Sequence, residues 1–417
     1  MNQSSQIQVA IQLLDLFFAS RAPFDIILAK FFKKNKIGSH DRRAIAEFCY
    51  SIFRNFEKLK FLTQKITSNF GRFYILAFLK TNEKWSNDKI NETFSGKQYD
   101  PSKLTDFEKR FLSSLDKNIA FPENALFNYS EWMSPYLKRS FGKELSNEMS
   151  ALNGKATVDL RVNTLKASKD EVKQALSDLG FQVEDCRYST SGLKILRGRI
   201  GRNCDVISKG LAEIQDEGSQ LVAEACGTVA GDTVVDYCAG AGGKTLAIAA
   251  TMKNKGRIFA LDKYEERLEN AKLRFRRAGV NNAFCQQITG KWIKRRLEFA
   301  DIVLVDAPCS GTGTWRRNPD MRAKFAQEDL QELLAVQAEI LESAYRLVKK
   351  GGRLVYATCS ILKEENEDQV AKFLENHSDF SRVKVRLQNY SGDYLKLTPY
   401  QNKTDGFFAA VLERAGA

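Results

Sequence analysis

Two of the eight cysteines, Cys309 and Cys359, follow directly on short apolar runs of the kind that form buried strands. A cysteine thiolate is a strong nucleophile, and a second thiol beside it can donate or accept a proton. A free thiol has a pKa of about 8.5, so such a site must lower that pKa, for which a helix start or a nearby lysine is suited. A single cysteine is more often a buried packing residue. A chemical role therefore requires that the fold bring these two together.

The spacing of the cysteines and the scarcity of histidine exclude several other chemistries. The chain has no CxxC pair, and His40 and His377 are its only histidines. This pattern is unlike a structural zinc site or a small disulfide framework, so we expect free thiols and no metal. A Ser–His–Asp or Cys–His mechanism is disfavoured because it would depend on one of two isolated histidines.

A glycine-rich segment at 236–245 joins a predicted strand to a predicted helix and is typical of a nucleotide-cofactor site. Its glycines, Gly240, Gly242 and Gly243, let a ligand approach the backbone closely and direct the helix amides at an anionic group. The next strand ends in Asp262, whose carboxylate can bind both hydroxyls of a ribose.

Three classes of ligand could satisfy this geometry. A P-loop requires glycine at the position of Cys238, and a dinucleotide fold requires GxGxxG, a spacing that the chain does not have. S-adenosyl-L-methionine fits best, because it offers a ribose to Asp262 and a carboxylate to the loop and helix start. The remaining alternative is that the glycines only form a tight turn.

The elements that must position these groups alternate between strand and helix patterns after Gly210. We expect strands at 233–238, 257–262, 301–307, 353–358 and 406–413, and helices at 244–252, 264–278 and 328–348. This alternation predicts an α/β fold with a doubly wound, mostly parallel sheet whose ligands bind at the carboxyl ends of its strands. Both cysteines and the glycine segment then face one crevice.

A pair of thiols beside a methyl donor can modify carbon 5 of cytosine, which by itself is a poor nucleophile. Addition of a thiolate to carbon 6 makes carbon 5 reactive toward the methyl sulfonium of S-adenosylmethionine. The proton on carbon 5 must then leave and the thiol must be eliminated, steps that a second acid/base group can assist. The target base must be unpaired or flipped out of its stack for the thiol to reach it.

Five segments together resemble the RsmB/NOP family of RNA 5-methylcytosine methyltransferases: DYCAGAGGKT, LDKYEERLENAKLR, DAPCSGTGTWRRNPD, YATCSILKEENE and TDGFF. The resemblance covers the chain from about Leu211 and implies a class I Rossmann-like methyltransferase domain. It implies that Cys359, in the TCS segment, is the nucleophile and that Cys309 takes part in product release. DNA cytosine methyltransferases use the cysteine after the fourth-type strand and lack the TCS cysteine, so the presence of both favours RNA.

The same resemblance implies a cofactor site and contacts to the target base. Lys244 is expected to touch the cofactor carboxylate or the base, and Asp306 to orient the cytosine as well. The implied cofactor-binding residues are Cys238, Ala239, Gly240, Ala241, Gly242, Gly243, Lys244, Asp262 and Asp306.

Two positions depart from the pattern of the family. Its usual Ala-Pro-Gly-Gly-Lys is here Gly240-Ala241-Gly242-Gly243-Lys244, and its acidic residue after the third strand is replaced by Thr289. The second change is expected to weaken a contact to the adenine end of the cofactor.

The part of the chain before the sheet divides into two predicted domains. The first 120 residues follow helical spacing apart from a polar stretch at 81–105, which is expected to form a loop. Ser39-His40-Asp41-Arg42 and Phe53-Arg54 resemble a NusB-like RNA-binding domain. Residues 121–210 are expected to form a small α/β RNA-binding extension, with strands at 157–162 and 193–196 and a helix at 170–179. The segment Leu160–Leu165 is similar to that extension in the family. The methyltransferase domain then spans 211–417.

The formal net charge of +13 indicates a polyanionic partner. Arg316 and Arg317, next to Trp315, are expected to contact RNA while the indole stacks on a base. For the clusters at 274–277 and 291–296 a solvated helix face is favoured.

We expect a cytoplasmic monomer without a membrane segment that acts on RNA, with ribosomal RNA favoured over transfer RNA. The alternatives are a transfer RNA or DNA cytosine methyltransferase and a ribosome-assembly RNA-binding factor.

Overall fold

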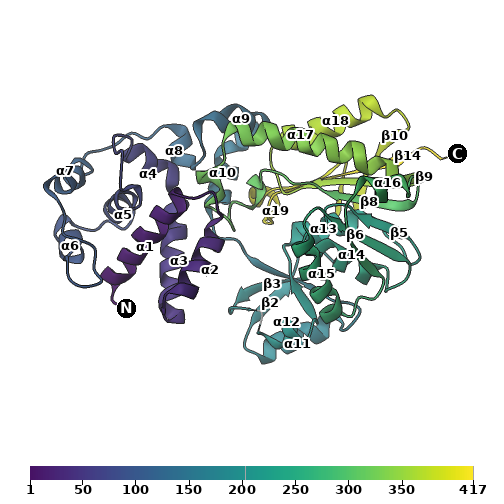
Figure 1. Cartoon of the computed structure of the whole chain (residues 1–417), viewed down its shortest axis with the longest axis horizontal. Helices are drawn as coiled ribbons and strands as arrows, with labels where there is room; N and C mark the ends of the chain where they lie inside the picture. The colour runs from purple at the N-terminus through teal and green to yellow at the C-terminus, as the bar shows by residue number, and fades with distance from the viewer. Residues whose placement is uncertain (202, 417) are drawn as a thin grey trace. The chain divides into compact units, whose positions relative to one another are not determined.

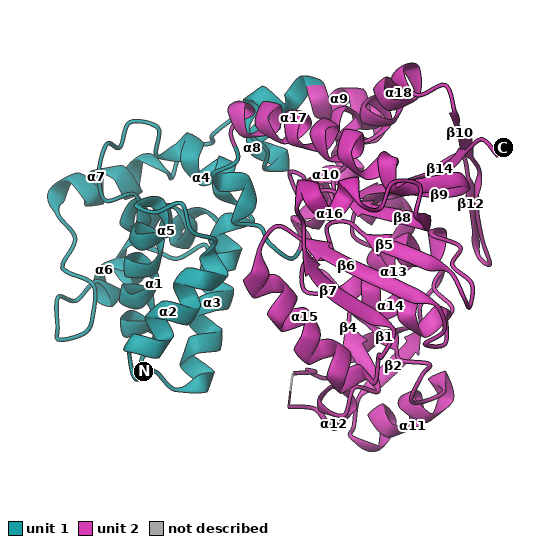
Figure 2. Ribbon diagram, turned by 45° about the vertical axis from the view of Figure 1, so that its right-hand side comes forward, with its two compact units in different colours: residues 1–135, 317–325 teal, residues 136–316, 326–417 magenta. Residues whose placement is uncertain are grey.

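The computed structural model describes residues 1–201 and 203–416, which fall into two compact units (Figure 2). Unit 1 comprises residues 1–135 together with 317–325, and unit 2 comprises 136–316 and the chain from 326 onward. The chain therefore leaves unit 2 after Arg316, contributes a short segment to unit 1, and returns. No described helix is both long enough and apolar enough to cross a membrane.

Unit 1 is helical, as the spacing of its apolar residues predicts (Figure 1). Its core is formed by apolar side chains that repeat along one face of each helix, such as Leu13, Leu14 and Phe17 of the first helix. Full burial of each such side chain stabilises the unit by roughly 1.5–3 kcal/mol. The helices are α1 (Gln3–Phe18), α2 (Phe24–Lys34), α3 (Ser39–Phe53), α4 (Phe56–Leu62), α5 (Phe70–Thr81), α6 (Asn87–Thr93), α7 (Asp106–Ser114) and α8 (Glu123–Phe127).

Helix α6 corrects the expectation that residues 81–105 form only a loop. The Ser86 hydroxyl accepts a hydrogen bond from the backbone N–H of Lys89 at 3.2 Å and caps the helix start. Ile90 is fully buried in the core. A polar sequence thus folds into a short helix because one cap and one apolar anchor are enough when the rest of the unit supplies the packing surface.

The segment 317–325 packs into unit 1 through hydrogen bonds, some of which it accepts and some of which it donates. The Asp320 carboxylate accepts a hydrogen bond from the backbone N–H of Phe24 at 3.1 Å. The buried Arg322 donates to the carbonyl of Asn128 at 2.9 Å, and Lys324 Nζ donates to the carbonyl of Ser20 at 2.6 Å.

Unit 2 begins with helices α9 (Ser134–Phe141) and α10 (Leu145–Asn153) and a four-stranded antiparallel sheet of order β2-β3-β1-β4. Leu160, Leu176 and Leu193 form the core between this sheet and helix α11. The predicted strands and helix of this region are confirmed within two residues. Their bounds are β1 (Val158–Val162), α11 (Lys169–Asp178), β2 (Gln182–Asp185), β3 (Gly192–Arg197), α12 (Asp205–Ser208) and β4 (Ala212–Ile214).

The large sheet of unit 2 has the order β10-β14-β9-β8-β5-β6-β7, and its five strands from β9 to β7 are parallel. This confirms the doubly wound class expected from the sequence. The parallel strands are β5 (Thr233–Asp236), β6 (Arg257–Asp262), β7 (Ala283–Gln287), β8 (Ala300–Asp306) and β9 (Val348–Thr358). Strand β14 (Phe407–Arg414) pairs antiparallel with both β9 and β10 (Phe380–Val383).

Helices cover both faces of this sheet, and adjacent residues of one strand show how (Figure 1). Val234 of β5 packs in a core with α13 (Glu217–Ala225) and α14 (Gly243–Thr251), whereas Val235 packs with α16 (Gly290–Lys294), α17 (Gln327–Ala344) and α18 (Glu367–Asn376). Helix α15 (Glu265–Ala278) lies against α14 through Phe275 and Leu246. The carboxyl ends of the parallel strands meet at one edge of the sheet, and the candidate site lies there.

Candidate active site

The two cysteines predicted to meet are brought together by neighbouring parallel strands. Cys309 follows β8 and Cys359 follows β9, and their Sγ atoms lie 3.4 Å apart. The loops are also joined through the backbone, because the N–H of Gly313 donates to the carbonyl of Cys359 at 3.0 Å. Both side chains are partly exposed, so a substrate atom can reach them.

The surroundings of Cys309 favour its protonated form. The pKa of Cys309 is raised well above its ordinary value, first by its hydrogen bond to Cys359, then by burial and by the negative charges of Cys359 and Glu365. Cys309 therefore keeps its proton beside the sulfur of Cys359.

Lys244 supplies a positive charge beside this pair. It is the second residue of α14, and its Nζ lies 2.6 Å from Oδ2 of Asp306 at the end of β8. Burial lowers the pKa of Lys244, but the charge and hydrogen bond of Asp306, together with the charge of Cys359, outweigh it and raise the pKa overall. Lys244 is therefore charged in the site, and its charge lies near Cys359.

The glycine segment forms the tight turn between β5 and α14 and is fixed by Asp262. One oxygen of Asp262 accepts from the backbone N–H of Gly240 at 2.9 Å, and the other accepts from the N–H of Tyr264 at 2.8 Å. Gly242 has φ of +75°, and a Cβ there would lie 2.4 Å from the Phe275 ring, so only glycine fits. Beneath the turn, Asp236 is buried and accepts from the Thr245 hydroxyl at 2.7 Å.

The geometry of this turn fits S-adenosylmethionine. Gly240 has φ of +55°, and a Cβ built on it would meet nothing within 4 Å, so the space above the turn is open to a ligand. The Asp262 carboxylate suits the ribose hydroxyls, and the start of α14 with Lys244 suits the carboxylate of the methionine part.

Comparison with known proteins identifies the family. The model described as 16S rRNA methyltransferase RsmB/F matches residues 225–413, and that of the ferredoxin-like domain of RsmF/B-like methyltransferases matches 129–200. A probable ribosomal RNA small subunit methyltransferase B of Synechocystis is 32% identical over 301 residues, which cover 69% of this chain and 67% of that protein. The chain belongs to the RsmB/F family of RNA methyltransferases. Its methyl donor is S-adenosylmethionine.

Other relatives extend the likeness to the whole chain. A probable ribosomal RNA small subunit methyltransferase B of Bacillus subtilis is 27% identical and aligns over 100% of both chains. The solved structure of the protein PH0851 matches with a TM-score of 0.80 and 27% identity over 99% of both chains. A methyltransferase homolog protein from Pyrococcus horikoshii matches with a TM-score of 0.62 and 28% identity, over 70% of this chain and 97% of that one.

A buried carboxylate that the sequence did not single out joins the two cysteine loops in this RsmB/F chain. Glu365 accepts from the backbone N–H of Ser310 at 2.8 Å and from its hydroxyl at 2.5 Å, and also from the hydroxyl of Ser360. The side chain of Gln337 on α17 donates to it at 3.0 Å. Glu365 lies in the YATCSILKEENE segment, but its role depends on contacts across fifty residues that no local pattern shows.

The structure contradicts the expected RNA contact of Trp315 and Arg316. Trp315 is fully buried, so its ring is not available for a base to stack on. Arg316 is 7% exposed, and its Nε and Nη2 donate to Oδ1 of Asp405 at 2.9 and 2.7 Å. The pair forms because Gly313 and Gly406 pack backbone to backbone, with the N–H of Gly406 donating to the carbonyl of Gly313 at 2.8 Å. Arg316 thus stabilises the loop after Cys309.

The structure also shows where Arg317, Thr289 and the cluster at 274–277 lie. Arg317 is partly exposed and belongs to unit 1. Thr289 caps α16 by accepting from the N–H of Trp292 at 3.1 Å. The cluster at 274–277 is not simply a solvated face, because Arg274 and Arg277 both pair with the buried Glu213.

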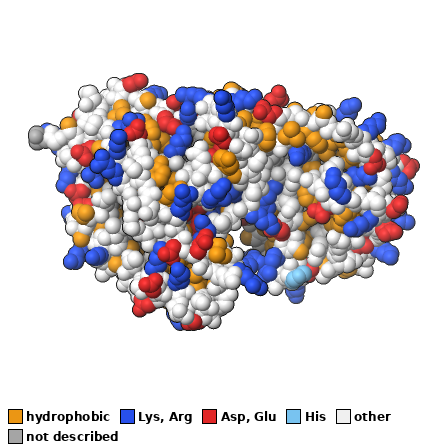
Figure 3. All heavy atoms as spheres, turned by 180° about the vertical axis from the view of Figure 1, so that it is seen from behind, with side chains coloured by type: hydrophobic (Ala, Val, Ile, Leu, Met, Phe, Trp, Pro, Cys, Tyr) orange, Lys and Arg blue, Asp and Glu red, His pale blue; other side chains and the backbone are white. Residues whose placement is uncertain are grey.

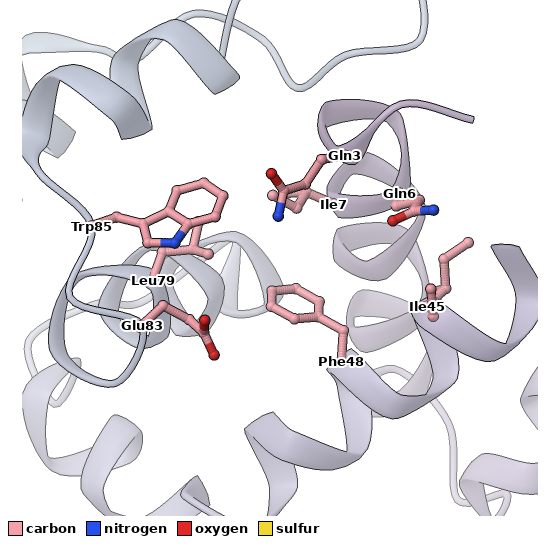
Figure 4. Close-up of a pocket in the computed structure, with 9 residues that line it drawn as sticks. Gln3, Gln6, Ile7, Ile45, Phe48, Leu79, Glu83 and Trp85 are labelled. Carbon is pink, nitrogen blue, oxygen red and sulfur yellow. The ribbon is translucent and has the colours of Figure 1, made fainter.

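Unit 1 has a small pocket of about 200 Å³, and its lining residues differ in type from those of the cysteine site (Figure 4). Phe48 and Trp85 face it, together with Gln6 and the carboxylate of Glu83. Its described lining includes no cysteine or lysine, so it has none of the groups that the cysteine site uses.

Proposed function

We propose that this RsmB/F chain methylates carbon 5 of a cytosine in ribosomal RNA, with Cys359 as nucleophile and Cys309 as the group that assists release. The observation that carries the proposal is the 3.4 Å separation of the two Sγ atoms, with Lys244 and Asp306 paired beside them. Ribosomal RNA is favoured because the relatives named above are ribosomal RNA small subunit methyltransferases.

The proposed reaction begins when the Cys359 thiolate forms a bond to carbon 6 of the base. Lys244 supplies a positive charge near the sulfur of Cys359, and Cys309 keeps its own proton beside it. Asp306, held by Lys244 at 2.6 Å, is positioned to accept a hydrogen bond from the exocyclic amine of the cytosine. S-adenosylmethionine supplies the methyl group that carbon 5 takes up.

Completion of the reaction requires that carbon 5 lose its proton and that the bond between sulfur and carbon 6 break. The sulfur of Cys309 accepts the carbon 5 proton while its own proton passes to the departing sulfur of Cys359, and the electrons of the broken C–H bond restore the double bond between carbons 5 and 6. Cys309 is placed to protonate that leaving sulfur, because it holds its own proton next to Cys359 until this step. The pair therefore divides into a nucleophile and an assisting thiol.

The surface charge is consistent with a nucleic-acid substrate. The net charge is +13, and Lys and Arg side chains occur over much of the face in Figure 3, interspersed with Asp and Glu. We further propose that residues 1–120 are a NusB-like RNA-binding domain and that 121–210 are the RNA-binding extension.

The test uses the full chain with S-adenosylmethionine labelled in its methyl group. Ribosomal RNA, transfer RNA and DNA are offered separately, and the products are digested to nucleosides. We expect label in 5-methylcytidine from ribosomal RNA. Label in transfer RNA or DNA alone would show that the substrate is not ribosomal RNA. Label on another atom of the base would overturn the cytosine-5 chemistry.

A further inference from the structure

The cofactor turn of this chain is flexible by composition around Ala241. Gly240 and Gly242, on either side of it, both have positive φ. Glycine leaves the backbone of an unliganded turn many conformations. Asp262 holds the N–H of Gly240, so the carbonyl of Ala241 is the part of the turn that requires a further contact.

Such a contact is present and comes from helix α15. Nη1 of Arg274 donates to the carbonyl of Ala241 at 2.7 Å. Nη2 of the same guanidinium donates to Oε2 of Glu213 at 2.9 Å. Because a guanidinium is planar and rigid, its two hydrogen bonds fix the position of the Ala241 carbonyl relative to Glu213.

Glu213 is itself held in place by its surroundings. It lies on β4 of the small sheet, is 3% exposed, and its second oxygen accepts from Nη2 of Arg277 at 2.5 Å. The buried Arg161 of β1 lies near enough for Glu213 to raise its pKa, although burial, the larger effect, lowers that pKa overall to about 10. Glu213 is therefore held by its place in the small sheet and by its ion pair with Arg277.

We propose that Arg274 is a positioning residue for S-adenosylmethionine, which holds the Gly240–Ala241 turn in its ligand-accepting conformation by linking it to Glu213. Arg274 does this through the backbone of Ala241 and has no role in the reaction at the cysteines. The small sheet thereby contributes to the cofactor site. The inference rests on the methyl donor alone and does not depend on which base is methylated.

Arg277 provides a matched control within the same helix. It also pairs with Glu213, but no hydrogen bond to the turn is among its described contacts. Replacement of either arginine removes one charge and one Glu213 partner. The two variants therefore differ mainly in the contact to Ala241.

The measurement is the dissociation constant of S-adenosylmethionine for the full chain, by calorimetry, with the melting temperature of the free protein followed in parallel. Loss of one charge-assisted hydrogen bond that is partly exposed should weaken binding by about tenfold in Arg274→Ala and by less than twofold in Arg277→Ala. The Michaelis constant for the cofactor should rise in Arg274→Ala, while kcat at saturating cofactor and the Michaelis constant for RNA stay unchanged.

A second comparison tests whether Glu213 acts through Arg274. Glu213→Gln should weaken cofactor binding about threefold in the wild-type background and have no further effect in Arg274→Ala. Equal losses in the two arginine variants, an unchanged dissociation constant in Arg274→Ala, or additive effects with Glu213→Gln would each overturn the proposal.

Discussion

Cys309 and Cys359 lie with their sulfur atoms 3.4 Å apart although fifty residues separate them. The pKa of Cys309 is raised by this contact, by burial and by the charge of the nearby Glu365. Two like groups at this distance cannot both be thiolates without strong repulsion. The pair can therefore take the separate roles proposed above, with Cys359 as nucleophile and Cys309 as the assisting thiol.

The separate tasks predict opposite behaviour of the two cysteine variants. Cys309→Ala should still form the bond to carbon 6 but release RNA slowly, so that enzyme covalently attached to RNA accumulates and turnover falls by about 100-fold or more. Cys359→Ala should form no adduct. The measurement is a denaturing gel of enzyme incubated with RNA and S-adenosylmethionine, and Cys226→Ala, a buried cysteine elsewhere, serves as control. An adduct in Cys359→Ala but not in Cys309→Ala would exchange the two roles.

Glu365→Gln is expected to weaken the hydrogen bonds that hold the two cysteine loops together, while both cysteines are kept. The glutamine would present an amide N–H₂ to donors that now share a carboxylate, the N–H and hydroxyl of Ser310 and the hydroxyl of Ser360. Leaving such buried donors without an acceptor costs about 1–3 kcal/mol. We expect kcat to fall about tenfold and the melting temperature to drop. Glu364→Gln, at the adjacent position, should change kcat by less than twofold.

Arg316→Ala should act on folding, in contrast to the expectation drawn from its sequence context. Removal of this guanidinium takes a charged partner from Asp405, which is fully buried, and breaking such a pair costs about 3–5 kcal/mol. The melting temperature should fall by several degrees. Arg276→Ala, which changes an exposed side chain, should leave it almost unchanged. Equal melting temperatures for the two variants would show that the pair with Asp405 contributes little.

The sequence predicted the class of sheet, the convergence of Cys309 and Cys359 and the turn at 236–245 because each depends on local signals. Strand and helix periods, glycines and strand ends are visible within a few residues. Trp315 and Arg316 were misjudged because an exposed and a buried Trp-Arg pair have the same local sequence. Only the approach of Gly406 to Gly313, about ninety residues apart in the chain, buries this pair.

The contacts of Glu365 and of Arg274 could not be predicted for a related reason. Each residue lies in a charged helical or turn segment that is expected to be solvated, and each takes its role from a partner on another element. Helix α6 was missed because a single buried Ile90 gives no period to detect.

Asp236 beneath the cofactor turn should make folding stability depend on pH. Burial raises its pKa to about 7, against the opposing effect of its hydrogen bond from Thr245. In the unfolded chain the carboxyl titrates near 3.8, so between about pH 4 and pH 7 the unfolded state has lost this proton while the folded state retains it. Because the folded state binds the proton more tightly, its stability falls as pH rises through that window and levels off above it. The contribution is roughly 4 kcal/mol at most.

Asp236→Asn removes this titration while keeping an oxygen for the Thr245 hydroxyl. The melting temperature of the variant relative to wild type should therefore rise by about 5 °C between pH 5 and pH 8. Asp178→Asn, at an exposed position, should show a constant difference over the same range. A constant difference for Asp236→Asn as well would mean that the buried carboxylate is already ionised in the folded protein at pH 5, with Lys244 as the nearby charge that could hold it so.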